Sequence, residues 1–199
     1  MARNLTQADE LIPPELTSLG PITAERFEEI CRKYDYLRLE LTSTGELIVM
    51  PPTGFQSGVR NMDLTSQLRV WSKGDNTGVC FGVDTGFTLP NGAIRAPDAG
   101  WIKREKFDSL TEEQKDTFAP ICPDFVVELR SKTDRLAVLF NKMAEYIENG
   151  ASLGWLIDPS TRRVYVYRPN EEVVILKNPE SVSGEPLLPG FTLLTADLW

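Results

Sequence analysis

The sequence predicts a single α/β (α+β) domain in which helices pack on a mixed central β-sheet, with extra β-hairpins. Two short, almost continuously apolar runs, 125–129 and 153–157, are typical of strands covered on both faces. Between them, apolar residues at helical spacing predict an amphipathic helix over 134–149. The expected buried stripe of this helix is Leu136, Leu139, Phe140, Met143 and Ile147. A chain of 199 residues, 41% of them hydrophobic, can bury one sizeable core.

Turn and capping signals place the other elements. Thr23 is suited to cap a first helix, with Ile22 packing on Phe27. Ser131 and Asp134 have the spacing of a capping box for the helix over 134–149, and Gly150 can end that helix. We expect residues 1–20 to form an arm outside the core and residues 21–199 to form the domain. Within it we expect a hairpin at 37–50, a helix at 57–73, and strands at 78–89 and 93–103 around Asn91-Gly92. A charged surface excursion at 104–120 and an edge hairpin at 164–176 are also expected.

Composition excludes several classes of site. The chain has no histidine, which rules out a Ser-His-Asp triad, a Cys-His nucleophile and a histidine-ligated zinc site. Its net charge of -8 requires any nucleic-acid role to use a local basic groove or a basic partner. The three cysteines lack zinc spacing, and no signal peptide or apolar run of about 18 residues occurs. We therefore expect reduced thiols, no membrane span and a cytoplasmic location.

Two acidic residues lie where solvation does not explain them. Glu128 falls inside the apolar run 125–129, where an ionised carboxylate needs a partner or a metal. Asp98 follows Pro97, which removes a ladder donor and suggests a bulge or strand end that aims the side chain into a cleft. Two converging carboxylates suit a hard cation such as Mg²⁺. The alternatives are that Asp98 caps a turn and that Glu128 is a paired structural residue.

A third group should carry a fixed positive charge near the carboxylates. Arg130, Lys132 and Lys142 are candidates, and Lys142 can reach Glu128 if its helix packs back across the sheet. An ordinary helix lysine is the alternative for Lys142. Glu40, the polar member of an alternating strand, is a weaker candidate for the same cleft, and a solvent-facing position is the favoured interpretation.

An ordered set of motifs resembles the Uma family of restriction-endonuclease-like proteins. The resemblance covers nearly the whole chain after the N-terminal arm. Its motifs are Gly45-Glu46-Leu47-Ile48-Val49-Met50-Pro51-Pro52-Thr53-Gly54, Arg95-Ala96-Pro97-Asp98, Val126-Val127-Glu128-Leu129-Arg130-Ser131, Lys142 with Tyr146, Trp155-Leu156-Ile157-Asp158-Pro159, and Gly190-Phe191.

The resemblance implies a PD-(D/E)XK nuclease core. Pro97-Asp98 matches the first half of the motif and Glu128 the second acidic ligand, with the carbonyl of Leu129 as a further metal ligand. The family usually carries its lysine on the following helix, which Lys142 matches, while Arg130 holds the strand position and cannot act as a base. Val138 stands where many members have an acidic residue, and Phe55-Gln56 stands where many have His-Gln.

The leading hypothesis is a Mg²⁺-dependent endonuclease acting on DNA, with Mn²⁺ able to substitute. Asp98 and Glu128 would bind the metal, Lys142 would orient or activate water, and Arg130 and Lys132 would touch phosphate. The alternative is a catalytically inactive restriction-endonuclease-like module with a binding or regulatory role, favoured by the net charge, Arg130 and Val138. A glycosidase-like carboxylate pair is a distant third. A homodimer is expected, with the hairpin over 164–176 offering an edge.

Overall fold

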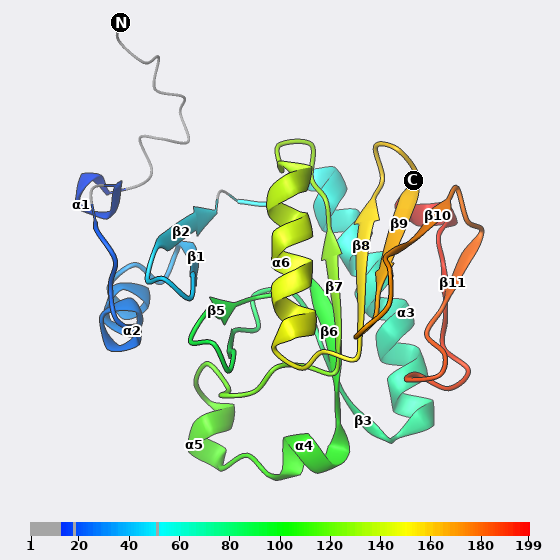
Figure 1. Cartoon of the computed structure of the whole chain (residues 1–199), viewed down its shortest axis with the longest axis horizontal. Coiled ribbons are helices and arrows are strands. Elements are labelled where there is room, and N and C mark those ends of the chain that lie inside the picture. The colour runs from blue at the N-terminus through cyan, green and yellow to red at the C-terminus, as the bar shows by residue number, and fades with distance from the viewer. Residues whose placement is uncertain (1–12, 18, 51) are drawn as a thin grey trace, which may run out of the picture.

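The computed structural model describes residues 13–17, 19–50 and 52–199. At its centre is a six-stranded sheet in the order β10-β9-β8-β7-β6-β3 (Figure 1). β7 and β8 are parallel, and the other neighbours are antiparallel, so the mixed sheet is confirmed. The strands are β3 (Gly78–Phe81), β6 (Ala99–Lys103), β7 (Phe125–Leu129), β8 (Leu153–Asp158), β9 (Arg163–Tyr167) and β10 (Val174–Lys177).

Two helices cover the two faces of this sheet. Parallel strands need a long crossover connection, and α6 (Leu136–Glu148) supplies it between β7 and β8. α6 lies across one face, and α3 (Phe55–Asp75) lies on the opposite face (Figure 1). A crossover helix packs on the strands it joins, so side chains of α6 lie above β7.

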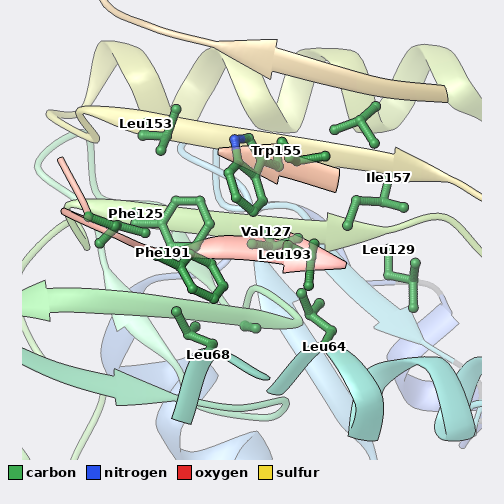
Figure 2. Close-up of a cluster of buried hydrophobic side chains, with 14 of the residues drawn as sticks. Leu64, Leu68, Phe125, Val127, Leu129, Leu153, Trp155, Ile157, Phe191 and Leu193 are labelled. Atoms are coloured by element: carbon green, nitrogen blue, oxygen red, sulfur yellow. The ribbon is translucent and has the colours of Figure 1, made fainter. Parts of the chain in front are cut away.

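Alternation along β7 divides its side chains between the two faces. Phe125, Val127 and Leu129 belong to the core beneath α3, which also contains Leu64 and Leu68 of that helix (Figure 2). Val126 belongs to the other core, on the α6 side. Because strand side chains alternate, Glu128 points to the same side as Val126. The α6-side core includes Met143, Tyr146, Leu156 and Tyr165.

A second, four-stranded sheet lies beside the first, in the order β2-β1-β5-β4. Its strands are β1 (Arg38–Leu41), β2 (Leu47–Met50), β4 (Phe87–Thr88) and β5 (Ile94–Arg95). α2 (Ala24–Lys33) packs against it, and Thr23 caps α2 by accepting from the backbone N–H of Arg26, as predicted. In the expected N-terminal arm, α1 (Pro14–Thr17) buries Leu16 against Ile30 of α2 and Tyr34, and residues 1–12 and 18 lie outside the described part.

The two strands expected around Asn91-Gly92 form a bent hairpin shared by both sheets. β3 pairs with β6 in the large sheet, and β4 pairs with β5 in the small one. The return strand breaks between Arg95 and Ala99, around Pro97, because proline cannot donate to a ladder. The predicted interruption at Pro97 is therefore confirmed, and Asp98 lies at the junction of the two sheets.

Other elements differ in detail from the prediction. The expected surface excursion contains two short helices, α4 (Arg104–Asp108) and α5 (Glu112–Lys115), and Thr111 and Gln114 form a capping box for α5. Asp134 accepts from the backbone N–H of Ser131 at 2.7 Å, but α6 begins two residues later. β11 (Ser181–Ser183), β12 (Thr192–Leu194) and the 3-10 helix η1 (Ala196–Leu198) complete the chain. No helix in the described part is both long and apolar enough to cross a bilayer.

Candidate active site

Glu128 is buried beneath α6, with two of that helix's side chains directed at it. Its side chain contacts the ammonium of Lys142, whose Nζ lies 2.7 Å from Oε1. The hydroxyl of Tyr146 donates to the same oxygen at 3.1 Å. Lys142 and Tyr146 are four residues apart, so they share one face of the helix. Glu128 is thus a partnered buried carboxylate, as the strand pattern required.

Glu40 of β1 is the second partner of Lys142. The Lys142 Nζ lies 2.7 Å from Oε1 of Glu40, which also accepts from the backbone N–H of Ala96 at 3.0 Å. Arg95 lies 3.2 Å from the other carboxylate oxygen. With only 2% of its surface exposed, Glu40 is not solvent-facing, and that favoured interpretation is wrong. Its strand belongs to the second sheet, so the alternation along β1 could not reveal the helix above it.

Arg95 extends the network to a third carboxylate. Its Nε lies 2.6 Å from Oε2 of Glu145 on α6, and the arginine is itself 8% exposed. Glu145 and Lys142 therefore hold β5 and β1 against the helix from the same turn. The sequence assigned no role to Arg95 or Glu145. The one signal in the sequence was that Glu145 lies three residues after Lys142. Oppositely charged residues at this spacing are common on exposed helices, so the pattern does not indicate a site.

Asp98 completes the cluster from the junction between β5 and β6. Its Oδ2 accepts from the backbone N–H of Leu129 at 2.8 Å, which fixes it beside the end of β7. The Asn61 side chain of α3 donates to Oδ1 at 3.3 Å. Asn61 was not predicted to belong to the site. The signal in the sequence was a polar amide in line with Leu64 and Leu68 on the same helix, and the structure leaves Asn61 8% exposed. The structure therefore brings Asp98, Glu128 and Lys142 together from three distant segments.

The acids of this cluster have unequal pKa values because their partners differ. Burial, together with the charges of Asp98 and Glu40, raises the pKa of Glu128 to about 8 despite the contact with Lys142. Burial also raises the pKa of Asp98, only partly offset by the Leu129 N–H and the charges of Lys142 and Arg38. For Glu40, Lys142, Ala96 and Arg95 outweigh burial and lower the pKa.

Lys142 remains an ammonium ion in this environment. Burial alone would lower its pKa, but the Glu128 and Glu40 carboxylates outweigh burial and raise the pKa above its usual value. A lysine with a raised pKa is a charge donor and hydrogen-bond donor at neutral pH, and it cannot accept a proton. The hydroxyl of Tyr146 also stays protonated, because burial and the nearby carboxylates raise its pKa well above the usual value.

Arg130 and Lys132 follow β7 but are placed differently from the cluster. The Arg130 guanidinium lies 2.8 Å from Oδ2 of Asp158 and donates to the backbone oxygen of Asp134 and the hydroxyl of Ser160, both at 3.3 Å. Asp158 is fully buried at the end of β8. Lys132 is exposed in the loop before α6. The structure thus gives Arg130 a stabilising role, and its contact with phosphate stays a prediction.

A cavity of about 1060 Å³ opens beside Asp98, between the β1–β2 hairpin, α3 and the end of β3. Two of its lining residues act directly on Asp98. Asn61 donates to the Asp98 carboxylate, and the charge of Arg38 lowers its pKa. The lining is mostly apolar, and its charged members are Arg38, Arg69 and Asp84. The carboxylate cluster therefore adjoins a space large enough for a substrate.

The cluster fits a hard divalent cation in its donor chemistry. Among residues 13–17, 19–50 and 52–199, no three His, Cys, Asp or Glu side chains are grouped to hold a metal ion. Mg²⁺, however, is commonly bound through one or two carboxylates and retains several waters. Glu40, Asp98, Glu128 and Glu145 are accompanied by the charges of Lys142, Arg95 and Arg38, so acids outnumber these cations when all four are ionised. A divalent cation would offset this imbalance.

Known proteins place the fold and the family. A solved structure described as "a putative nuclease belonging to DUF820", from Anabaena variabilis ATCC 29413, matches with a TM-score of 0.73 at 21% identity, over 89% of this chain and 97% of that chain. The likeness shows a restriction-endonuclease-like fold. No protein of curated function matches the sequence. The model of the Uma2 family, described as "Putative restriction endonuclease", matches residues 24–197, and the chain therefore belongs to the Uma2 family.

Proposed function

We propose that the protein is a metal-dependent endonuclease that hydrolyses phosphodiester bonds in DNA. The observation that carries this proposal is the convergence of two buried carboxylates, Asp98 and Glu128, with the protonated Lys142. Family membership supports a nuclease, and the structural neighbour supports the fold. Buried acids with raised pKa values next to a cavity are typical of catalytic sites.

Asp98 and Glu128 would hold the metal, with the backbone carbonyl of Leu129 as a third ligand and Mg²⁺ or Mn²⁺ as the ion. The chemistry such an ion supplies is activation of water and stabilisation of charge on the phosphate. Asn61 and the Leu129 N–H orient the Asp98 carboxylate. Tyr146 and Lys142 both contact Oε1 of Glu128, so Oε2 would be the oxygen that binds the metal.

Lys142 would orient the attacking water and offset negative charge on the phosphate. Its pKa, raised by the Glu128 and Glu40 carboxylates, favours this role over proton abstraction. Glu40, itself paired with Arg95, holds the lysine between β1 and β7, where the carboxylates of Glu40 and Glu128 both contact it. We assign Lys132 as a phosphate contact because it is exposed beside the end of β7. Arg130 would reach phosphate only by exchanging its bond to Asp158.

Two further assignments belong to this proposal. With a net charge of -8, DNA must be bound through a local groove or with a basic partner, and the cavity beside Asp98 with Arg38 and Arg69 is the groove that we assign. A homodimer would form through β10, the end strand of the large sheet, and the protein would act in the cytoplasm.

The test is cleavage of supercoiled plasmid with Mg²⁺ or Mn²⁺ by the unmodified chain and by Asp98→Asn. We expect cleavage that requires the metal and falls at least about 100-fold in the variant. Asp124→Asn is the matched control, because Asp124 is a buried acid with its own lysine partner, Lys106, at 3.2 Å. Equal cleavage by Asp98→Asn and the unmodified chain would contradict the proposal.

The alternative function is a catalytically inactive binding or regulatory module. The observation that favours it is the engagement of Lys142 with two carboxylates and of Arg130 with Asp158, which leaves both cations neutralised within the protein. Calorimetric titration with Mg²⁺ and Mn²⁺ separates the two. Absence of binding, or binding unchanged by Glu128→Gln, would favour the inactive module.

A further inference from the structure

The cavity beside Asp98 has walls that suit nucleobases better than a phosphate backbone. Tyr36 and Met62 line it, and 65% and 66% of their respective surfaces are exposed. Phe81 also lines the cavity, half-buried, and its ring centroid lies 4.6 Å from that of Phe87, with the two rings tilted by 55°. Exposed aromatic and apolar side chains lining a cavity of this size are a stacking surface, because every base has an apolar face.

The charges around the cavity favour a single strand over a duplex. Duplex binding draws on many phosphate contacts from lysine and arginine, whereas this chain has a net charge of -8. The cavity itself has two arginines, Arg38 and Arg69, against one acid, Asp84, which lies 2.5 Å from Arg38. This small positive excess is enough to accompany a short stretch of backbone, with most of the affinity coming from stacking.

The cavity is continuous with the carboxylate cluster. Asn61 belongs to both, since it lines the cavity and donates to Asp98 at 3.3 Å. Arg38, at the cavity wall, also acts on Asp98 through its charge. A strand whose bases entered the cavity would therefore have its backbone near Asp98.

We infer that this cavity binds unpaired nucleotides, so that single-stranded DNA, rather than regular duplex, is the substrate class. In a duplex the base faces are already stacked on one another and are not free to pack against the walls of the cavity. The inference rests on the proposed function for the location of cleavage, but the binding that it describes is independent of turnover.

The experiment measures fluorescence anisotropy of a labelled oligodeoxynucleotide, single-stranded or annealed to its complement, with the full chain in EDTA. We expect the single strand to bind at least about tenfold more tightly than the duplex. Tyr36→Ala and Met62→Asp should each weaken single-strand binding about tenfold. Val70→Asp is the matched control for Met62→Asp, because Val70 is 76% exposed on the same helix and lies outside the cavity.

The comparison of single strand with duplex uses the unmodified chain, so it does not depend on any variant folding. Equal or tighter duplex binding would overturn the inference, as would a Met62→Asp variant with normal thermal unfolding and unchanged single-strand affinity. The proposed function fails separately. Tight single-strand binding without metal-dependent cleavage would support the inference and count against the nuclease. Metal-dependent cleavage of duplex alone would support the nuclease and count against the inference.

Discussion

The ammonium nitrogen of Lys142 and the Oε1 oxygen of Glu128 lie 2.7 Å apart, between helix α6 and strand β7. The same nitrogen lies 2.7 Å from Glu40 on a different sheet. One side chain thus joins the crossover helix, the central sheet and the smaller sheet. The pair therefore affects the stability of the fold as well as the chemistry proposed for the cluster.

Replacing Lys142 with methionine should destabilise the protein and abolish cleavage. The change leaves two buried carboxylates without their shared cation, and removal of one partner from a buried pair typically costs about 3–5 kcal/mol. Urea unfolding at pH 8 measures this loss. Lys106→Met is the control, because Lys106 also pairs with a buried acid, Asp124, but its side chain is 31% exposed and lies outside the cluster. An equal loss of cleavage in both variants would contradict the role of Lys142.

The stability of the metal-free protein should fall as pH rises from about 5 to about 9. Glu128 has a pKa of about 8 in the folded state, above the value of 4.5 for an exposed glutamate, so the folded state binds the extra proton in this window. Its contribution to stability is full below pH 4.5 and is lost as pH passes through 8. Urea unfolding in EDTA should show a decline on the order of 4–5 kcal/mol. Glu128→Gln should flatten the decline, and an identical pH profile would show that another group causes it.

Arg130→Gln separates a stabilising role from a phosphate contact. The variant leaves Asp158 buried with only the hydroxyl groups of Ser160 and Thr161 as side-chain partners, so stability should fall by about 1–3 kcal/mol. If Arg130 also contacts phosphate, the slope of log K for DNA binding against log salt concentration should fall in magnitude by about one in the variant. Lys132→Gln is the control, expected to weaken DNA binding without altering unfolding. Unchanged stability in Arg130→Gln would refute the structural role.

Self-association should depend on the free edge of β10. Val174 and Ile175 of β10 are 46% and 49% exposed, and the preceding Val173 is 42% exposed. An apolar end strand readily pairs with a second copy. We expect a concentration-dependent dimer in sedimentation velocity, reduced to monomer by Ile175→Lys. Leu194→Lys, at a residue 60% exposed on β12, is the matched control. A monomer at every concentration would exclude this edge as an interface.

The strand and helix pattern determined much of the fold from the sequence. β7 and β8 were recognisable because strands buried on both faces carry unbroken apolar runs, and α6 because its stripe repeats with helical spacing. The cost of an acid inside such a run marked Glu128. Pro97 marked the break that carries Asp98, because it cannot donate to a ladder. These are local properties of a strand, so the sequence alone reveals them.

What surrounds those residues was decided by tertiary structure. Glu40 looked solvent-facing because alternation along β1 defines two faces and does not say which one a distant helix covers. Contact with Lys142 depends on the packing of the two sheets, over a separation of 102 residues. The pairing of Arg95 with Glu145 and of Arg130 with Asp158 likewise joins separate elements. The sequence marked Glu128 and Asp98 as acids that need partners. The packing of α6 over both sheets decided which cations are present and that Glu40 and Glu145 join them, because contacts between distant elements have no local pattern.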